Sequence, residues 1–297
     1  MKLSSTASAV ESLAVTADAA LRPFEPGDLP AAHALSSTLG WPHRLEDWQF
    51  ALSLGQGVVA ERNGKVLGTA LSWKFGANHA TIGLVIVAPE LQGQRIGNRM
   101  MEALLDGLAA RDVLLIATAA GRGLYERLGF VCTGEIEQHQ GVLAALPALP
   151  ASARREGDRL RPLAAADAGS LIAMDTRGAG MARGELLRRL FSEEKTVVLV
   201  RDGHVAGFAV LRRHGLGHAI GPVAAPDLNA ARLLIAECCR QAKGFVRVDV
   251  YASGGLAPWL ESLGLPRAGG GSVMVRGRVP ERGPAHGSWA LVTQAIG

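Results

Sequence analysis

The stretch Val85–Met101, which reads VIVAPELQGQRIGNRMM, decides the fold of this chain. An apolar β-branched run ends at Pro89, a Gln-Gly turn follows, and an apolar helical stripe begins near Ile96. This order predicts a strand, a tight turn and the first turn of a helix, where backbone N–H groups lack partners within the helix. Such amides and the positive end of the helix dipole together form a site for phosphate. Gly93 and Gly97 let the backbone approach an anion with no Cβ in the way.

A second motif, GLYERLGF, covers Gly123–Phe130 and predicts a short helix that runs into a strand. In this order, the two motifs resemble the signatures of the GCN5-related N-acetyltransferase superfamily, whose pyrophosphate loop reads Gln/Arg-x-x-Gly-x-Gly/Ala. Gln92, Ile96 and Gly97 match this pattern, while Arg95 replaces its first glycine. We expect an arginine there to be compatible with a helical conformation and to add positive charge.

The resemblance implies a site for acetyl-CoA. In the family the sheet splays between the strand that ends here at Val87 and the strand at Val113–Thr118, and pantetheine enters the gap like an added strand. Tyr125 falls where the family places a tyrosine facing the thioester sulfur, so it would donate a proton to the coenzyme A thiolate. The alternative for Tyr125 is an aromatic core residue on a short helix. The residues expected to bind the cofactor are Val85, Ile86, Val87, Gln92, Gly93, Gln94, Arg95, Ile96, Gly97 and Asn98.

Acetyl transfer to an alkylamine also needs a base, because the amine is protonated at pH 7 and its deprotonation costs about 4 kcal/mol. Some family members carry a glutamate on the strand that corresponds to Ala80–Val87, which has no acidic residue here. His79 begins this strand, and histidine is the residue type suited to proton transfer near neutral pH, so it is a candidate base or proton relay. The alternatives are that His79 is only an exposed strand-end histidine, and that a chain of waters takes the proton.

The segment Trp41–Trp48, which reads WPHRLEDW, carries two tryptophans in a chain with only 5% aromatic residues. The resemblance places this segment beside the acceptor pocket, and its rings could stack on an aromatic or cationic acceptor. The alternative is an apolar contact around a helix start, with Asp47 as a surface charge. The candidate substrate residues are Trp41, His43, Asp47 and Trp48.

Two stretches of the chain return at a constant offset. Leu21–Pro23 recurs as Leu160–Pro162, and Val58–Leu71 recurs as Val197–Val210, each longer copy predicting a hairpin with an Asn-Gly or Asp-Gly turn. A repeat of this length indicates two similar domains, each an α/β fold with a mixed, mainly antiparallel sheet flanked by helices. We therefore divide the chain into a disordered leader (1–20), a catalytic domain (21–142), a linker (143–158) and a degenerate second domain (159–297).

The second copy lacks the chemistry of the first. After Pro226 the chain has no glycine over Asp227–Arg232, and Leu260 stands where Tyr125 stands in the first copy. A carboxylate and extra Cβ atoms would repel and crowd a pyrophosphate. The arrangement resembles a bacterial group of tandem N-acetyltransferases with a degenerate C-terminal copy. We expect the second domain to wall off the acceptor site or to mimic a dimer partner, in a monomeric pseudo-dimer or a homodimer.

Composition favours a globular protein: 48% of the residues are hydrophobic and 20% are charged. A net charge of +4 comes mostly from scattered arginines rather than a basic stripe, so nucleic acid is not an expected partner. No apolar run approaches the roughly 20 residues that span a bilayer, and no signal peptide is evident, so we expect a cytoplasmic protein without a membrane partner. The three cysteines and eight histidines show no metal-ligand spacing.

The expected activity is transfer of an acetyl group from acetyl-CoA to a primary amine of a small molecule, by direct attack in a ternary complex. Two alternatives stay open: an acyltransferase that uses a larger acyl-CoA, and a non-catalytic protein that binds or senses acyl-CoA. A dinucleotide-binding fold is excluded because no Gly-x-Gly-x-x-Gly opens a first strand–helix unit.

Overall fold

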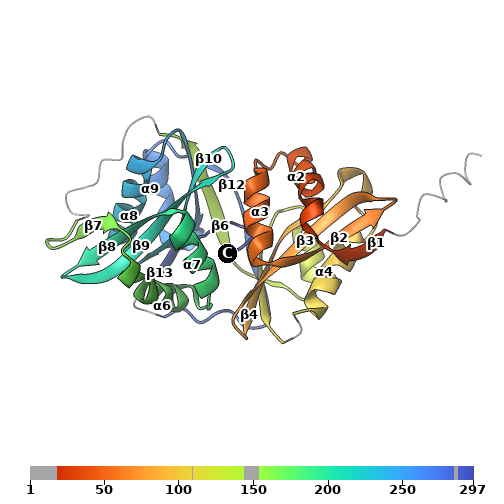
Figure 1. Ribbon diagram of the computed structural model, residues 1–297, viewed down its shortest axis with the longest axis horizontal. Coiled ribbons are helices and arrows are strands. Elements are labelled where there is room, and N and C mark those ends of the chain that lie inside the picture. Colours follow the sequence, from red (N-terminus) through yellow and green to blue (C-terminus); the bar gives the residue numbers. More distant parts are fainter. Residues whose placement is uncertain (1–18, 109, 144–153, 284–286) are drawn as a thin grey trace, which may run out of the picture.

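The computed structural model describes residues 19–108, 110–143, 154–283 and 287–297, and it contains one continuous sheet of 13 strands (Figure 1). The leader expected over residues 1–20, apart from residues 19 and 20, lies outside the described residues, and so does most of the linker expected over residues 143–158. The sheet order is β1-β2-β3-β4-β5-β12-β6-β11-β13-β10-β9-β8-β7. The strands are β1 (Ala20–Pro23), β2 (Gln56–Arg62), β3 (Lys65–Phe75), β4 (His79–Val87), β5 (Asp112–Ala117), β6 (Val131–Val142), β7 (Arg159–Pro162), β8 (Lys195–Arg201), β9 (His204–His214), β10 (Gly217–Ala225), β11 (Phe245–Tyr251), β12 (Arg267–Arg276) and β13 (Gly287–Ala290).

The α-helices follow the same order in the two halves, while the positions of the 3₁₀ helices differ after the first one. The first half has η1 (Pro26–Asp28), α2 (Leu29–Thr38), α3 (Leu45–Leu54), η2 (Pro89–Leu91), α4 (Ile96–Asp106) and α5 (Arg122–Arg127). The second half has η4 (Ala165–Asp167), α6 (Ala168–Ala179), α7 (Gly184–Glu193), α8 (Leu228–Gln241), η5 (Ala252–Gly254) and α9 (Ala257–Ser262). The parallel order confirms the two similar α/β domains that the internal repeat predicts.

The paired hairpins show why the repeat could be recognised. Asn63 and Gly64 join β2 to β3 with φ values of 54° and 77°, and Asp202 and Gly203 join β8 to β9 with 51° and 80°. Two successive positive φ values define the tight hairpin turn that suits twisted strands, and Asn-Gly and Asp-Gly tolerate that conformation best.

The two halves exchange their last long strands. Strand β12 of the second half pairs antiparallel with β5, from Arg276 opposite Val113 to Ser272 opposite Ala117. Strand β6 of the first half lies on the far side of β12 and pairs with β11 of the second half, from Ile136 opposite Tyr251 to Val142 opposite Phe245. Neither half therefore completes its sheet without a strand of the other half.

Helix α4 covers one face of the first-half sheet because its apolar residues form a single stripe. Met100, Met101 and Leu104 are buried against Ile82 and Leu115 of the sheet. Burial of each large apolar side chain stabilises the fold by roughly 1.5–3 kcal/mol. The spacing of these apolar residues along α4 confirms the helix that the sequence predicts in this segment.

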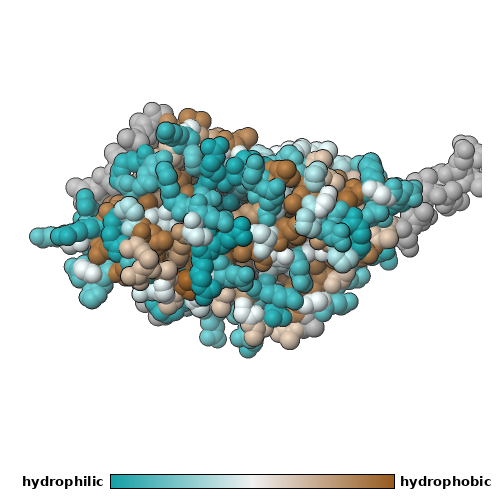
Figure 2. All heavy atoms as spheres, viewed as in Figure 1, coloured by the Kyte–Doolittle hydropathy of each residue, from teal (hydrophilic) through white to brown (hydrophobic). Residues whose placement is uncertain are grey.

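The opposite face carries a core that both halves share. Side chains from α2 and α3 pack with side chains from α6 and α7 in one cluster, which includes Trp48, Trp73, Leu171 and Leu187. Figure 1 shows α3 and α7 on either side of the middle of the molecule. Hydrophilic residues dominate the face seen in Figure 2, including the seam between the halves. Among the described helices, none is long and apolar enough to cross a membrane.

Candidate active site

Strands β4 and β5 of the first domain diverge, and the place where they do so is called the β4–β5 cleft below. They pair in parallel only from His79 opposite Asp112 to Thr81 opposite Leu114, and then separate. Strand β3 continues to pair with the other edge of β4 as far as Val87. The cleft-facing edge of β4 beyond Thr81 therefore offers backbone groups that an extended ligand could bond like an added strand.

A bulge in β4 lies beside this cleft. Leu84 has a φ of 51°, and the register with β3 shifts between Thr69 and Leu71. The Thr69 hydroxyl donates a hydrogen bond of 2.9 Å to the Leu84 carbonyl oxygen and holds the bulge in place. An extra residue re-aims the strand beyond it. As a result Ile82 and Val85 pack against the same α4-side core, although strict alternation would put them on opposite faces. The sequence carries no glycine or asparagine at position 84 that could have signalled this bulge.

The turn before α4 presents a row of free amides. After η2, Gln92 is extended, Gly93 has a φ of 83°, and α4 begins at Ile96 with no side chain capping its amides. Within the described residues, the backbone N–H groups from Gly93 to Asn98 have no hydrogen-bond partner, and the first used is that of Arg99, which donates to the Arg95 carbonyl at 3.1 Å. Unpaired amides at a helix N-terminus are the donor set that a phosphate requires.

Arg95 does not adopt the helical conformation that we expected for it. It lies in the left-handed region, with φ 61° and ψ 8°, as the residue before the helix. Glycine takes this conformation without penalty, whereas a side chain costs about 1 kcal/mol there. The family pattern has glycine at this position, so the same turn is built here at a small cost in backbone strain, with an exposed guanidinium added beside the amides.

Arg95→Gly should therefore separate two effects. We expect the free energy of unfolding to rise by up to about 1 kcal/mol from relief of strain, and acetyl-CoA affinity to fall roughly threefold or more from loss of charge. Urea denaturation and calorimetry at two salt concentrations measure both. Asn63→Gly is the matched control, because Asn63 has a similar φ of 54° in a distant hairpin. Unchanged affinity in Arg95→Gly would exclude a contact between Arg95 and the cofactor.

Helix α5, which carries Tyr125, contacts the start of α4. Leu124, the neighbour of Tyr125, packs close to Gly97: a Cβ on Gly97 would lie 3.4 Å from Leu124 Cδ2. The Tyr125 ring is 8% exposed and meets Phe130 edge-on, with centroids 6.1 Å apart. Burial raises the pKa of Tyr125 to about 12, so the phenol is protonated at neutral pH.

His79 lies far from the turn before α4. It begins β4 at the end where β4 and β5 still pair, opposite Asp112. A strand rises about 3.3 Å per residue, so the length of β4 separates His79 from Val87 by roughly 25 Å. The turn before α4 follows Val87, and His79 therefore lies at the far end of β4 from the free amides.

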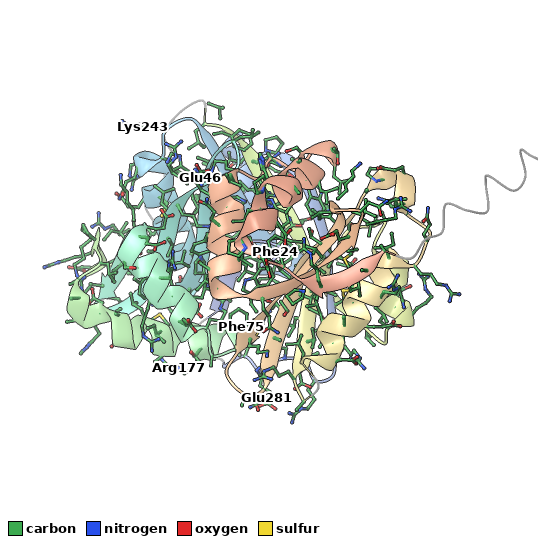
Figure 3. All side chains as sticks on the ribbon, turned by 45° about the vertical axis from the view of Figure 1, so that its right-hand side comes forward. Phe24, Glu46, Phe75, Arg177, Lys243 and Glu281 are labelled. Atoms are coloured by element: carbon green, nitrogen blue, oxygen red, sulfur yellow. The ribbon has the colours of Figure 1, made fainter. Side chains whose placement is uncertain are left out.

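In the Trp41–Trp48 segment, some side chains lie in the hydrophobic core and others lie at the contact between the two domains. Trp48 is fully buried, donates from Nε1 to the Ser36 hydroxyl at 3.2 Å, and stacks on Phe24, which Figure 3 labels beside α3, with centroids 6.1 Å apart. Asp47 is 7% exposed and faces the second domain rather than open solvent. Of the four candidate substrate residues, only Trp41 and His43 remain partly exposed, and their rings contact each other edge-on at 5.8 Å.

His43 also meets a histidine of the second domain. Its ring lies 5.7 Å from that of His214, and burial lowers the pKa of His43 to about 3 and that of His214 to about 4. Both are neutral in the folded protein at neutral pH, while in the unfolded chain each titrates near 6.5.

The buried pair of His43 and His214 predicts that the folded protein becomes less stable at acid pH. As the pH falls below 6.5, the unfolded chain takes up protons that the folded protein excludes, so stability falls. The loss at pH 5 is up to about 2 kcal/mol for each histidine. Urea denaturation at pH 7.5 and pH 5.0 measures this, and His214→Gln should remove about half of the difference. Equal stability of the wild-type protein at both pH values would contradict the prediction.

The corresponding cleft of the second domain is filled by the chain itself. Strands β10 and β11 pair in parallel only at His218 and Ala219 before they separate. Strand β13 then occupies the gap: Ala290 lies opposite Val223 of β10 and Val250 of β11. The Trp289 indole also donates to the Ala225 carbonyl at 2.9 Å. Sequence reasoning missed this strand, because four residues that include a glycine and a serine carry no clear strand pattern.

The N-terminus of α8, the counterpart of α4 in the second domain, is also occupied by a group of the chain itself. Asp227 caps α8 by accepting a hydrogen bond of 2.8 Å from the Ala230 amide. Its carboxylate also pairs with Arg201 at 2.9 Å and Arg155 at 3.1 Å. Leu260, the counterpart of Tyr125, is fully buried. An internal carboxylate and an internal strand thus stand where a pyrophosphate and pantetheine would bind.

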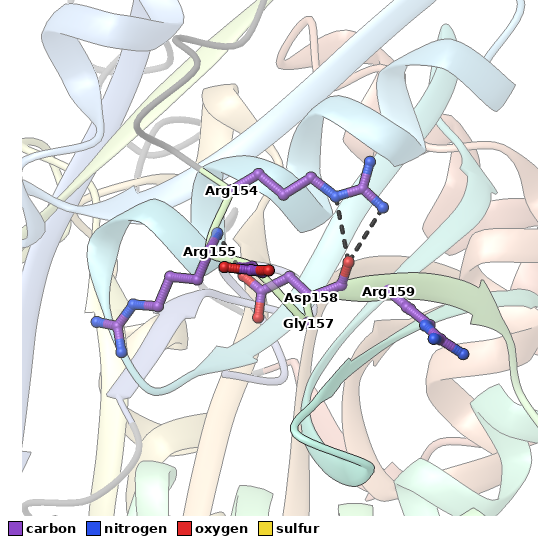
Figure 4. A pocket seen from close by; sticks show the side chains of 6 residues that line it. Arg154, Arg155, Gly157, Asp158 and Arg159 are labelled. Atoms are coloured by element: carbon purple, nitrogen blue, oxygen red, sulfur yellow. Dashed lines mark hydrogen bonds between the residues drawn. The ribbon is translucent and has the colours of Figure 1, made fainter.

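A hollow of about 510 Å³ lies beside this region, and the described residues that line it are 154–159 (Figure 4). Arg154 donates two hydrogen bonds, of 3.1 and 3.0 Å, to the Asp158 carbonyl oxygen, and Asp158 pairs with Arg201 at 2.7 Å. Arg154 and Asp158 are engaged in these contacts and the hollow belongs to the second domain, so we do not assign it as the reaction site.

Comparison with known proteins agrees with this geometry. Two family models, each described as an acetyltransferase (GNAT) domain, match residues 53–132 and residues 171–285, and together they cover more than half of the chain. No curated protein sequence matches the chain.

Solved structures share the whole fold. A putative acetyltransferase from Pyrococcus horikoshii is 17% identical with a TM-score of 0.77, covering 95% of this chain and 96% of its own. A tandem GNAT protein from the clavulanic acid biosynthesis pathway is 13% identical with a TM-score of 0.62, over 86% and 97% of the two chains. A GCN5-related N-acetyltransferase from Sphaerobacter thermophilus is 16% identical with a TM-score of 0.61, over 86% and 94%. The chain therefore belongs to the GCN5-related N-acetyltransferase family, as a tandem protein with two such domains.

Proposed function

We propose that the first domain transfers an acetyl group from acetyl-CoA to a primary amine of a small molecule. The observation that carries this proposal is the row of unpaired amides from Gly93 to Asn98, placed at the open end of the β4–β5 cleft. A donor set of this kind fits a pyrophosphate, and the exposed Arg95 adds a positive charge next to it. The unpaired edge of β4, including Val85 and Val87, offers the backbone contacts that a pantetheine arm requires.

Tyr125 supplies the acid in this proposal. In the ternary complex the amine nitrogen attacks the thioester carbonyl carbon, the C–N bond forms, and the C–S bond breaks. Because burial keeps the Tyr125 phenol protonated, its hydroxyl can pass a proton to the departing thiolate. The packing of Leu124 near Gly97 fixes α5, and with it this hydroxyl, relative to the phosphate site.

We assign no side chain as the base. His79 lies at the far end of β4, and Asp47 is engaged at the domain interface. The amine therefore loses its excess proton to water at the open end of the cleft. The second domain contributes structure rather than chemistry in this proposal, because its own cleft is filled by β13 and Asp227. One chain then functions as a pseudo-dimer.

Release of the coenzyme A thiol tests the proposed reaction. The full chain is mixed with acetyl-CoA and a panel of primary amines, with propionyl-CoA and succinyl-CoA as alternative donors. We expect at least one amine to raise thiol release well above hydrolysis without amine, most strongly with acetyl-CoA. Acetyl-CoA binding with no amine-dependent release from any donor would contradict the proposal and indicate an acyl-CoA binding protein.

A further inference from the structure

Residues 291–297, which follow β13, lie between the second domain and strand β4 of the first. The Thr81 hydroxyl donates a hydrogen bond of 3.0 Å to the Ile296 carbonyl oxygen. Two residues further along β4, a Cβ on Gly83 would lie 2.6 Å from both the Cα and the carbonyl oxygen of Ala295, so a glycine is needed to leave room for this backbone. The segment 291–297 therefore lies directly on β4, and Figure 1 marks its end, C, near the middle of the molecule.

This contact falls at the point where β4 leaves β5. Thr81 is the last residue of β4 that pairs with β5, opposite Leu114. Gly83 and then the bulged Leu84, with its φ of 51°, follow at the start of the β4–β5 cleft. Leu84 shares a hydrophobic cluster with Ile296 on the sheet face opposite α4. The segment 291–297 thus packs against the bulge and against the residues just before it.

Strain in β4 explains why this support matters. A leucine at a φ of 51° lies in the left-handed region, which a side chain occupies at a cost and only where its surroundings fix it. The Thr69 hydroxyl of β3 holds the Leu84 carbonyl oxygen at 2.9 Å, and the segment 291–297 holds Thr81 and Gly83. Loss of either support lets β4 relax from the bulged form, which changes the strand edge that borders the cleft.

Two buried arginines of the second domain anchor the segment 291–297. Arg183 is 1% exposed, pairs with Asp175 at 2.7 Å and donates from Nη1 to the Gly297 carbonyl oxygen at 2.8 Å. Arg212 is 3% exposed and donates from Nη2 to the Val292 carbonyl oxygen at 3.1 Å. Burial lowers the pKa of Arg212 to about 10, so the guanidinium is still charged at neutral pH. Charge-assisted hydrogen bonds therefore hold the segment near both of its ends.

Thr293 closes the segment into a compact turn. Its hydroxyl oxygen accepts hydrogen bonds of 3.1 Å from the Ala295 amide and 2.9 Å from the Ile296 amide. Its carbonyl oxygen accepts 3.0 Å from the Gly297 amide. Because the turn cannot bend away from β4 without breaking these bonds, it transmits the position of the second domain to Thr81 and Gly83.

We propose that the segment 291–297 sets the opening of the β4–β5 cleft, with Thr81 and Gly83 as the positioning residues through which it acts. This inference rests on the cofactor site of the proposed function and extends it. The second domain governs acetyl-CoA affinity through a contact on β4 rather than through a phosphate site of its own. When only a fraction of the molecules keeps β4 in the bulged form that binds, the apparent dissociation constant rises by the inverse of that fraction.

The same substitution at buried threonines separates this role from general stability. Thr81→Val and Thr293→Val each remove a hydroxyl of the contact, on β4 and in the segment, and keep the β-branched shape. Thr69→Val removes the hydroxyl that holds the bulge itself. Thr196→Val is the matched control, because Thr196 is 6% exposed in β8 and its hydroxyl has no hydrogen-bond partner among the described residues.

Hydrogen exchange of the full chain without any ligand tests the contact. We expect the amides of residues 82–87 to exchange at least about fivefold faster in Thr81→Val and in Thr293→Val, because the bulge loses part of its support. Thr196→Val should leave the exchange of these amides unchanged. Wild-type exchange of residues 82–87 in both contact variants would overturn the segment 291–297 as a support of β4.

Calorimetry with acetyl-CoA tests the consequence for the cleft. We expect the dissociation constant to rise about fivefold or more in Thr81→Val, Thr293→Val and Thr69→Val, and by less than about twofold in Thr196→Val. A general loss of stability does not raise this constant while the protein stays folded, which urea denaturation of the same variants checks. Wild-type affinity in both Thr81→Val and Thr293→Val would overturn the inference. A wild-type protein that binds no acetyl-CoA would instead refute the proposed cofactor site, while the exchange result still decides the contact.

Discussion

Replacing Gly97 by glutamate is expected to abolish acetyl-CoA binding while the fold survives. A Cβ at this position meets only Leu124 Cδ2 at 3.4 Å and Val87 Cγ2 at 3.6 Å, which are ordinary contacts. The carboxylate, however, would reach the free amides at the start of α4 and repel a pyrophosphate. Charge-assisted hydrogen bonds are worth about 1.5–3 kcal/mol each, so loss of two of them weakens binding at least about a hundredfold, and repulsion adds to this.

Gly97→Gln is the matched control for this prediction, because it has the same size without the charge. We expect calorimetry to show a smaller loss for glutamine than for glutamate, and thermal denaturation to show similar melting temperatures for both. Acetyl-CoA affinity within about twofold of wild type in Gly97→Glu would remove the pyrophosphate site from this turn.

Tyr125→Phe is expected to lower kcat by about a hundredfold or more, within the range that positioned acids provide. The substitution removes one oxygen and keeps the ring that packs on Phe130, so the fold and acetyl-CoA binding should be unaffected. Amine-dependent thiol release gives kcat, and calorimetry gives the dissociation constant for acetyl-CoA.

The chain offers a natural control, because it has only two tyrosines. Tyr251 lies in β11 with Arg282 over its ring at 4.2 Å, outside the cleft, and Tyr251→Phe should leave kcat within about twofold of wild type. Equal activity of Tyr125→Phe and wild type would exclude Tyr125 as the acid.

Local features of this fold could be predicted from the sequence because each has a local cause. The Asn63-Gly64 and Asp202-Gly203 turns confirm the predicted hairpins. Strand β4, the turn after it and α4 likewise follow the order of apolar, glycine-containing and amphipathic segments. The family models that match both halves confirm the tandem arrangement.

Pairing between distant segments could not be predicted in this way. The apolar pattern of β12 suits a place beside either half, and nothing in it states that Ser272 lies opposite Ala117 of the first half. The short β13 has no partner-specific signal either. The bulge at Leu84 and the left-handed Arg95 are set by surrounding packing, since neither residue type favours a positive φ.

In the candidate site, too, the local features could be predicted from the sequence, whereas the contacts between distant segments could not. The free amides and α5, which carries Tyr125, meet at Gly97 and Leu124, because the strand–turn–helix unit and α5 are fixed by local pattern. Trp48 and Asp47 turn out to serve the core and the domain interface, since aromatic and charged residues in a short segment do not reveal which neighbour will cover them. The second domain decides their environment, and its docking is invisible in the local sequence.

Titration of the full chain with acetyl-CoA by calorimetry tests the central claim most directly. The full chain is required, because β6 and β12 cross between the halves. The account predicts saturable binding at one site per chain, lost in Gly97→Glu and retained in Asp227→Asn. Absence of binding, or two equivalent sites per chain, would contradict an open cleft in the first domain and a self-filled cleft in the second.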